Sequence, residues 1–415
     1  MFTHKHIILT AFFALLTLSL FAQEPIPNAP KKTSKGLLFF YRIGNRIDHY
    51  LLQGVDTNYI TLPEHSWRLA YTNATVGVNS MITSTEEVSG GDQIYYGLGY
   101  RSTPSVDLGF NVGYRGFGFG YSWDALHAYA QRLSFSLGSK FIGIDFSIQT
   151  STNLRTTLHV GDIAQMPVNA NNAVITNANL SIWYALNSPR YSHQAAVKQS
   201  YIQRKTAGSP LLFLSYMSSQ VQLGDSLKLG NEYSSASTPA LMSGVTALRT
   251  RQIAVGIGYG INYTPNKGKV ILHASAAALL VTYSVNLVSF SLPDSVAEGL
   301  PDEPMYNLNP SYPVHVTGNM RAAVSWEINK WVHLSAWATA DHIRFRSNWT
   351  ANDNYLSLKN WNWKVQLTIG VRLGAGYDRV QRALIEYDIP PIPMQEKRQS
   401  KLPQWVLEYF YSPKL

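Results

Sequence analysis

Residues 361–373 alternate between apolar and polar side chains, and this alternation predicts a β-strand with two unlike faces. Successive side chains of a strand point to opposite faces. One face of this strand is therefore apolar, with Trp361, Trp363, Val365, Leu367, Ile369, Val371 and Leu373. The other face carries Lys364, Gln366 and Arg372. A soluble β-sandwich and a membrane β-barrel can both contain such a strand, so this segment alone does not decide between them.

The same alternation recurs along most of the chain, and the residues between the apolar positions are small or polar. Clear examples are 106–115, 142–149, 179–186 and 252–263. Apolar-out, polar-in segments of about ten residues are typical of transmembrane barrels, which favour even strand numbers in bacteria. The pattern predicts an all-β fold, an antiparallel transmembrane β-barrel of about 12 strands over residues 66–376. The polar stretches near 165–177, 223–247 and 290–312 are predicted loops.

The two ends of the chain differ from this central region. Residues 1–22 combine a basic start, an apolar run and a closing small residue, as a secretory signal peptide does. Residues 23–65 are a predicted periplasmic lead, in which 36–52 has the apolar spacing of a short amphipathic helix. Residues 377–415 are a predicted periplasmic C-terminal extension. Its late apolar run, 405–411, fits either a final strand or a short helix.

Composition supports an exported membrane barrel. Charged residues make up 14% of the chain, against about 25% in ordinary soluble domains, and aromatic residues reach 12%. The chain has no cysteine, which excludes disulfides and thiolate metal sites. No later segment approaches the ~18–20 apolar residues of a membrane-spanning helix. A net charge of +9 is compatible with a nucleic-acid partner, but export argues against one. A basic surface near anionic lipid explains the charge more simply.

Several polar residues are predicted to face the lumen because of their position in the alternation. These candidate residues are Asp107, Arg115, Asp145, Lys364, Gln366 and Arg372. Opposite charges inside a narrow barrel would pair and fill it, since unpaired buried charges are costly. A charge-selective constriction is the alternative. Pairing is the favoured interpretation.

The polar segment 190–209 could instead carry nucleophilic catalysis, which needs a serine and a histidine within hydrogen-bond reach. On a strand, His193 and its neighbour Ser192 would face opposite sides, and so would His193 and Ser200. We therefore expect these side chains to fill the lumen and hydrogen-bond to each other. The glycine-rich piece 113–121 lacks the setting of a phosphate loop. No cofactor, metal site or catalytic residue is predicted, and His273, His333 and His342 are interpreted as structural.

Specific phrases carry a family resemblance. They are Asp56 to Ile60, Phe117 to Asp124, Gln199-Ser200 followed by Gln203 to Ser209, and Gly258 to Tyr263. Over residues 36–376 the chain resembles an uncharacterised family of Bacteroides-type bacteria called domain of unknown function 4421. The resemblance implies an exported, outer-membrane β-barrel, and it supplies no activity or catalytic residues.

The sequence thus predicts an outer-membrane barrel, more a structural or narrow solute-conducting protein than an enzyme. One alternative is an embedded hydrolase of lipid or lipopolysaccharide. Another is a secreted β-sandwich that binds a partner, although its water-exposed aromatic faces would promote aggregation. The expected partners are outer-membrane lipid and lipopolysaccharide, the barrel-assembly machinery and small solutes.

Overall fold

The structure is a computed structural model of the whole chain. It describes Ile47, Leu51 and residues 54–373, apart from 88–92, 104, 126–129, 140, 153, 162–163, 169–171, 224–244, 267, 291–304, 309–313 and 349–354. The signal peptide and the C-terminal extension lie outside the described residues and stay predictions. Most of the helix expected over 36–52 is also outside them. Ile47 and Leu51 are described, and both have helical backbone.

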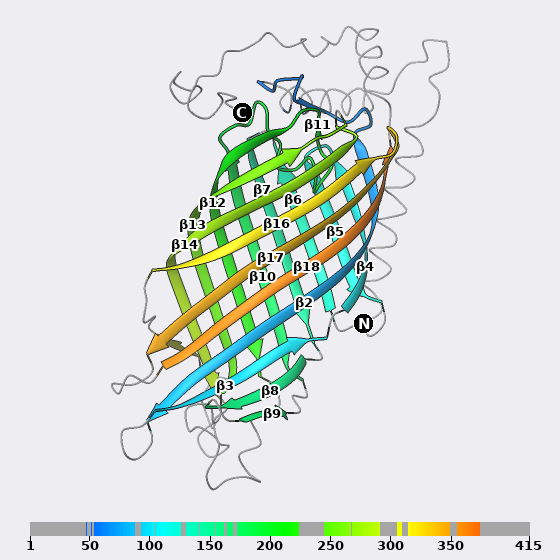
Figure 1. Cartoon of the computed structure of the whole chain (residues 1–415). Coiled ribbons are helices and arrows are strands. Elements are labelled where there is room, and N and C mark those ends of the chain that lie inside the picture. The colour runs from blue at the N-terminus through cyan, green and yellow to red at the C-terminus, as the bar shows by residue number, and fades with distance from the viewer. Residues whose placement is uncertain are drawn as a thin grey trace, which may run out of the picture.

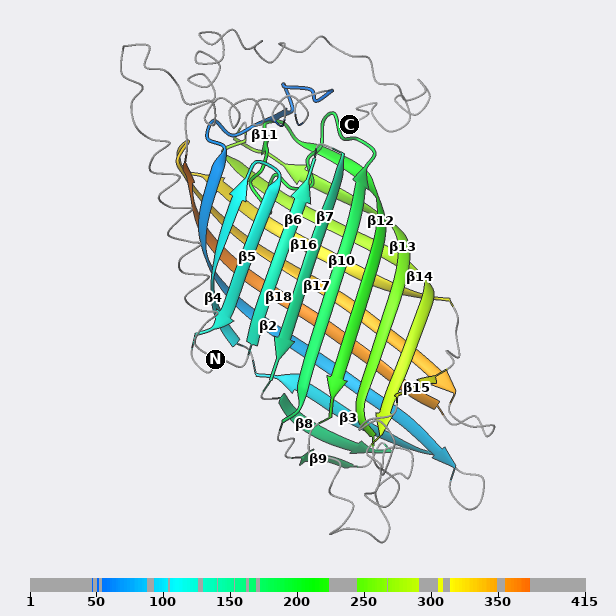
Figure 2. The same cartoon turned by 180° about the vertical axis from the view of Figure 1, so that it is seen from behind.

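Twelve antiparallel strands form a closed ring (Figures 1 and 2). In ring order they are β2 (Trp67–Glu87), β4 (Ser105–Tyr114), β5 (Phe117–Asp124), β6 (Ala130–Gly138), β7 (Ile142–Ser151), β10 (Val174–Ala185), β12 (Ala207–Gln222), β13 (Val245–Tyr263), β14 (Val270–Phe290), β16 (His315–Glu327), β17 (Val332–Asn348) and β18 (Tyr355–Leu373). β18 pairs with β2 from Leu373↔Trp67 to Leu356↔Ser84 and closes the ring. The prediction of a barrel of about twelve strands is confirmed, and the β-sandwich alternative is wrong because the two edge strands of the sheet pair with each other.

Short strands extend the wall beyond the ring. The edge of β2 pairs with β4 near its start and with β3 (Gln93–Ser102) near its end. β3 then pairs with β8 (Leu154–Val160), and β8 pairs with β9 (Ala164–Val168). β15 (Met305–Leu308) pairs with β14. β9, β15 and the starts of β10 and β13 fall in stretches predicted to be loops. β9 and β15 are too short to show an alternation, and β10 and β13 begin earlier than predicted.

The two ends of the barrel have different connections. At one end, called the turn end here, β2 begins and β18 ends, and this end is uppermost in Figure 1. Its turns are short, except for residues 186–206 between β10 and β12. The opposite end is called the loop end. Within 186–206, β11 (Ile202–Gln203) pairs with β1 (Ile60–Thr61), so the segment before the barrel is fastened to this connection.

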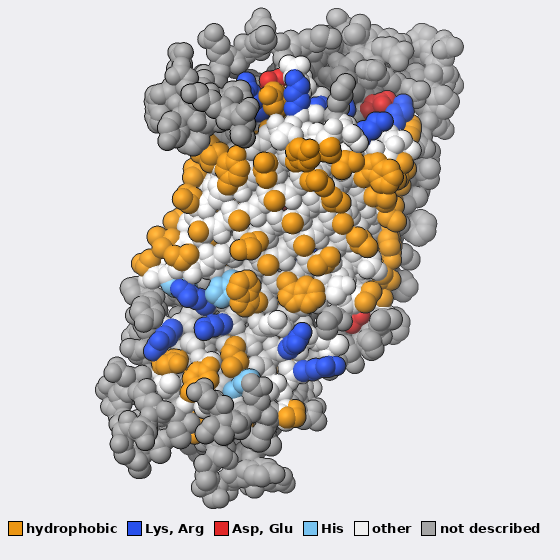
Figure 3. Space-filling view, in the orientation of Figure 1, with side chains coloured by type: hydrophobic (Ala, Val, Ile, Leu, Met, Phe, Trp, Pro, Cys, Tyr) orange, Lys and Arg blue, Asp and Glu red, His pale blue; other side chains and the backbone are white. Residues whose placement is uncertain are grey.

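The ring has an apolar exterior band (Figure 3). Trp361 is 48% exposed and Leu367 58% exposed, whereas Lys364 and Arg372 on the other face of β18 are buried. The apolar stretch from Trp361 to Val371 is roughly 33 Å long at about 3.3 Å per residue. Tilted by ~40°, it crosses ~25 Å, the height of the apolar band of a membrane barrel. Within the described part of the chain, no helix has the length and apolarity that a membrane span requires.

Candidate functional site: a charged chamber in the lumen

Charged side chains meet across the middle of the lumen. Asp145 on β7 accepts a hydrogen bond from Arg321 on β16, with 2.9 Å between Arg321 Nη1 and Asp145 Oδ2. Lys198, from the connection 186–206, has its Nζ 3.8 Å from Asp145 Oδ1. β7 and β16 stand on different sides of the ring. The walls are therefore close enough for direct side-chain contact, which leaves no wide channel at this level.

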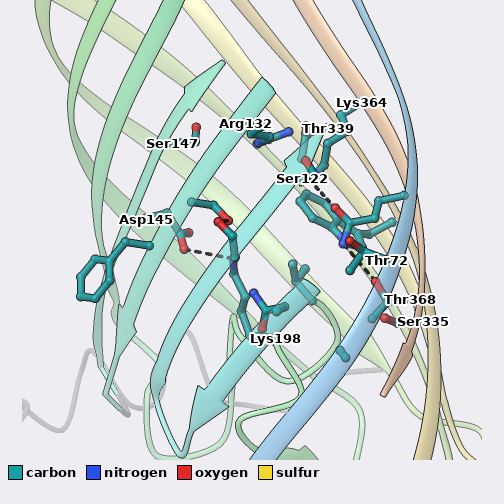
Figure 4. A pocket seen from close by; sticks show the side chains of 18 of the residues that line it. Thr72, Ser122, Arg132, Asp145, Ser147, Lys198, Ser335, Thr339, Lys364 and Thr368 are labelled. Carbon is teal, nitrogen blue, oxygen red and sulfur yellow. Dashed lines mark hydrogen bonds and ion pairs between the residues drawn. The ribbon is translucent and has the colours of Figure 1, made fainter. Parts of the chain in front are cut away.

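A cavity of about 100 Å³ surrounds this contact. Five cationic side chains and two carboxylates line it, namely Arg68, Arg132, Lys198, Arg321, Lys364, Asp145 and Asp341. Figure 4 shows several of these side chains pointing into the same space. Nε of Arg132 and Nε of Arg321 are buried and have no hydrogen-bond partner among the described residues. This chamber therefore has an excess of positive charge and unused donors.

Residues 186–206, called the plug segment here, fill the turn end of the lumen. Tyr191, Ala195 and Tyr201 are fully buried within it. The amide of Asn262 on β13 donates hydrogen bonds to Ser192 O at 2.7 Å and to Gln203 Oε1 at 3.2 Å. These bonds fix the plug segment to the barrel wall.

The wall is shaped to receive the plug segment. A Cβ at Gly260 would overlap the Tyr191 hydroxyl, and a Cβ at Gly138 would overlap the side-chain amide of Gln194. Glycine at these two wall positions provides the room that these buried side chains need. The plug segment and the wall thus fit each other residue by residue.

Charges at the mouth of the turn end add to this closure. Arg372 is 2% exposed and donates to Glu327 Oε1 at 2.6 Å and to Gln199 Oε1 at 3.0 Å. Gln199 has a left-handed backbone (φ 54°), a conformation that is uncommon outside glycine. Burial lowers the pKa of Lys198, and the carboxylate of Asp145 opposes that fall. The plug segment is therefore tied to the wall by charge as well as by hydrogen bonds.

Toward the loop end, an amide bridge crosses the lumen. Asn177 on β10 donates to Asn362 Oδ1 and accepts from Asn360 Nδ2, both at 2.8 Å, and Asn360 Nδ2 lies 2.7 Å from Ser219 Oγ. β10 and β18 occupy opposite positions in the ring. The bridge therefore spans the lumen from wall to wall.

Beyond the amide bridge the interior becomes apolar. A buried hydrophobic cluster, called the apolar cluster here, closes the loop end with side chains from many strands: Val78, Ile82, Leu98, Tyr100, Leu154, Ala173, Ile175, Val221, Leu223, Val245, Leu248, Val288, Leu308, Phe345, Leu356 and Leu358. The prediction that side chains facing the lumen are polar does not hold at this level. The chamber therefore lies between a polar closure and an apolar one.

The structure places the six candidate lumen residues at different levels. Asp145, Lys364 and Gln366 line the chamber, and Lys364 Nζ lies 3.7 Å from the centre of the Trp337 ring and donates to Gln366 Oε1. Asp107, Arg115 and Arg372 are not among the residues that line the chamber.

Asp107 is buried and accepts a hydrogen bond of 2.7 Å from Ser105 Oγ. Arg372 stands at the turn-end mouth. Arg115 occupies the tight turn after β4, with φ 50°, and its Nη1 donates to Pro63 O at 2.7 Å. Alternation along a strand does not apply in a turn, so its position there could not be read from the pattern.

Sequence reasoning missed a chain of three side chains inside the barrel. His273 Nε2 lies 3.2 Å from Ser275 Oγ, and His273 Nδ1 lies 2.8 Å from Asn262 Oδ1. Because the amide nitrogen of Asn262 donates to two acceptors, its Oδ1 accepts the Nδ1 proton, which leaves Nε2 to accept from Ser275. The spacing His-x-Ser, which puts both side chains on one face of a strand, is the pattern that could have shown this pair.

The serines considered from the sequence do not form such a contact. The ring of His193 bonds to the Tyr191 hydroxyl (Nδ1 to Oη, 3.0 Å), and among the described residues no hydrogen bond joins His193 to Ser192 or Ser200. His193 also packs against Trp183, with 4.8 Å between the ring centres. The same described residues contain no group of three His, Cys, Asp or Glu side chains that could hold a metal ion.

Comparison with protein families finds one whose description is "Domain of unknown function (DUF4421)", matched by residues 54–373. The chain belongs to this family. The resemblance stated from the sequence is thereby confirmed. A comparison with curated proteins finds no match.

Solved structures of outer-membrane proteins are similar to this chain only at a coarse level. The outer membrane protease OmpT from Escherichia coli is 9% identical, with 73% of this chain and 96% of that chain covered, at a TM-score of 0.33. The translocator domain of the autotransporter NalP from Neisseria meningitidis is 11% identical (83% and 100% covered, TM-score 0.27). OprG from Pseudomonas aeruginosa is 7% identical (75% and 98% covered, TM-score 0.25). TM-scores this low do not establish a shared architecture, so the barrel assignment rests on the closed ring of strand pairs.

Proposed function

We propose that this protein is an outer-membrane β-barrel that acts as a gated conduit for small anionic solutes. Export is supported by the signal-like residues 1–22, and membrane insertion by the apolar exterior of the ring. Aromatic side chains stand near the edges of that exterior, for example Trp326 and Trp361, as in the girdles of membrane barrels.

The observation that carries the anion preference is the composition of the chamber. Five cations face two carboxylates around one cavity. A barrel interior that served only to fill space would be expected to balance its charges, because uncompensated buried charge is costly. A small oxyanion in the chamber would compensate this excess and would use the guanidinium donors of Arg132 and Arg321.

Both closures would have to move for conduction. The plug segment is one continuous stretch held by hydrogen bonds and charge, so it can leave the lumen as a unit. The apolar cluster resembles the hydrophobic constrictions by which channels gate through dewetting. The state described here is the closed one.

Single-channel recording in planar bilayers tests this function. Wild type should carry no steady current. A variant with residues 191–201 replaced by a Gly-Ser linker, and with Phe345→Ser and Leu358→Ser, should show discrete steps. In a KCl gradient its reversal potential should indicate chloride preference, and adding Lys364→Gln and Arg132→Gln should weaken that preference. Steps that favour potassium, or a selectivity that these two substitutions leave unchanged, would contradict the proposal.

One observation favours a second candidate, a serine hydrolase inside the lumen. Ser275, His273 and Asn262 have the connectivity of a nucleophile, a base and an orienting group. The Ser275 hydroxyl would add to an ester carbonyl while its proton passes to His273 Nε2, which would return it to the leaving alcohol. Water would then release the acid by the same steps. Arg321 is directly opposite Ser275 across β14 and β16, a position from which it could attract an anionic ester.

The same contacts also have a simpler explanation, because Asn262 holds the plug segment. Labelling with a fluorophosphonate probe separates the two. A hydrolase should be labelled at Ser275, and Ser275→Ala should abolish the label, while Ser325→Ala, a buried serine on neighbouring β16, should keep it. No labelling of wild type, or equal labelling of Ser275→Ala, would leave these residues with the structural role alone.

A further inference from the structure

Basic side chains gather on the outside of the barrel near the loop end. Arg344 and Arg346 on β17, Lys359 on β18, Arg101 on β3 and Arg155 on β8 are all exposed. These strands are consecutive neighbours through β2. Figure 3 shows Lys, Arg and His side chains together on this face, below the apolar band. We call these five residues the basic wall.

Like charges in the basic wall stand directly opposite each other. The strand register pairs Arg344 with Lys359 and Arg101 with Arg155. Directly opposed like charges destabilise an antiparallel pair. Among the described side chains, no carboxylate lies on the outer face of β17, β18, β2, β3 or β8. Among these described side chains, nothing on the same face compensates the repulsion.

Inside the barrel, by contrast, two of the buried arginines contact a carboxylate directly. There, Arg321 meets Asp145 and Arg372 meets Glu327. The uncompensated pairs of the basic wall are thus a local feature, and an external anion would offset them.

The basic wall also has a defined height. Lys359 lies two residues before Trp361 in the sequence, on the same outer face of β18 and nearer the loop end. His342, the register partner of Trp361, packs against it with 4.5 Å between the ring centres and the rings tilted to each other. Tryptophan prefers the boundary between the acyl chains and the headgroups. In a membrane that covers the apolar band, the basic wall lies at the level of lipid headgroups.

We propose that the basic wall binds the phosphorylated headgroup of a lipid in the leaflet at the loop end. This proposal rests on the proposed membrane placement. Arginine forks bind phosphate oxygens in pairs of hydrogen bonds, and lysine supplies a point charge. With neighbouring strands ~4.8 Å apart, Lys359 and Arg101 stand two strands apart, roughly 10–12 Å. Two opposed cation pairs at that spacing suit a headgroup with two phosphates, and Trp361 lies where its acyl chains would begin.

Lipid titration with native mass spectrometry tests this site. The full-length barrel is titrated with bis-phosphorylated lipid A, with the same lipid after dephosphorylation, and with inorganic phosphate as a competitor. The variants are Arg344→Ser with Lys359→Ser, Arg101→Ser with Arg155→Ser, and all four together. The control is Lys205→Ser with Lys269→Ser, which removes two exposed cations at the turn end.

The proposal expects a three- to tenfold weaker binding of bis-phosphorylated lipid in each double variant and more than tenfold in the quadruple variant. The control and the dephosphorylated lipid should show no change. In lipid-free detergent the quadruple variant should be at least as resistant to heat as wild type, because repulsion is removed; added lipid should protect wild type only.

Equal lipid binding in wild type and the quadruple variant would overturn the proposal, as would an equal loss in the control. Full competition by inorganic phosphate would replace the lipid with a small-anion site. Resistance of the protein to carbonate extraction from liposomes is measured alongside. A chain that fails to insert refutes the membrane placement itself, whereas a chain that inserts and binds all lipids alike refutes only this inference.

Discussion

The two ends of the lumen are closed by different chemistry. The plug segment at the turn end is one continuous stretch, held by Asn262, Arg372 and Asp145 through hydrogen bonds and ion pairs and packed through the buried Tyr191 and Tyr201. The apolar cluster at the loop end is built from side chains of many wall strands, among them β2, β13 and β18. The first closure is a single segment bound to the wall, whereas the second is part of the wall itself.

For the conduit proposed above, this difference indicates which end would open first. Hydrogen bonds and ion pairs can be exchanged for bonds to water, so their net contribution is small, about 0.5–1.5 kcal/mol for a typical hydrogen bond. A buried apolar side chain has no such exchange and costs roughly 1.5–3 kcal/mol to expose. We therefore infer that the turn end opens first and that the loop end limits passage.

The largest effect is expected when the plug segment is removed. Replacing residues 191–201 with a Gly-Ser linker should expose the chamber to solutes from the turn end and lower resistance to denaturant. The chain has no cysteine, so Thr368→Cys in the chamber provides a single labelling site. A membrane-impermeant maleimide should label it slowly in the otherwise intact protein and at least tenfold faster when the plug segment is replaced. Similar rates in the two proteins would show that the plug segment is not a barrier.

Truncation within the apolar cluster should have the next largest effect. Phe345 is 4% exposed, and Phe345→Ala should lower the free energy of unfolding by about 3–5 kcal/mol, as buried phenylalanine truncations do. Phe119 faces outward and is 52% exposed, so Phe119→Ala is the matched control and should cost clearly less in detergent. Guanidinium unfolding followed by tryptophan fluorescence measures both. Equal costs would mean that Phe345 is not packed in the interior.

A smaller effect is expected for the ion pair in the chamber. Asp145→Asn removes the carboxylate that serves both Arg321 and Lys198 and should cost about 2–3 kcal/mol, since hydrogen bonds to charged groups contribute ~1.5–3 kcal/mol. It should also increase the anion preference of the opened barrel. An unchanged unfolding midpoint together with unchanged selectivity would contradict the role of this pair.

The smallest effect is expected for an exposed ion pair at the turn end. Lys330 Nζ lies 3.4 Å from Glu64 Oε1, and their side chains are 56% and 39% exposed. Exposed pairs of this kind contribute about 0–1 kcal/mol, so Lys330→Ala should shift the unfolding midpoint little. A loss of stability as large as that of Asp145→Asn would show that the buried ion pair does not contribute more than the exposed one.

The strand pattern was sufficient to predict the class of fold. An alternation that repeats every two residues predicts which side chains share a face of a strand. Trp361 and Leu367 could therefore be assigned to the outside of the barrel, and Lys364 and Gln366 to its inside. Short rim strands such as β9 and β15 escaped because four or five residues do not establish a period.

The candidate site could be predicted only in part. Asp145 and Lys364 were named as lumen residues, but Arg321, the partner of Asp145, comes from a strand distant in sequence. Trp337 lies on β17, next to the strand of Lys364, yet alternation gives no register between strands and so could not pair the two. The interpretation of 190–209 as lumen-filling residues agrees with the buried plug segment. The position of the plug segment at the turn end depends on the room that Gly138 and Gly260 leave in the wall.

The two faces of each long strand follow from the amino-acid sequence alone, because side chains alternate along any extended chain. Which side chains meet inside the ring depends on the folded barrel. The pairing of β18 with β2 closes the ring, and the width of that ring brings Asn177 to Asn362 and Asp145 to Arg321. Contacts across a lumen depend on strand order and register together, and both are properties of the whole assembled sheet.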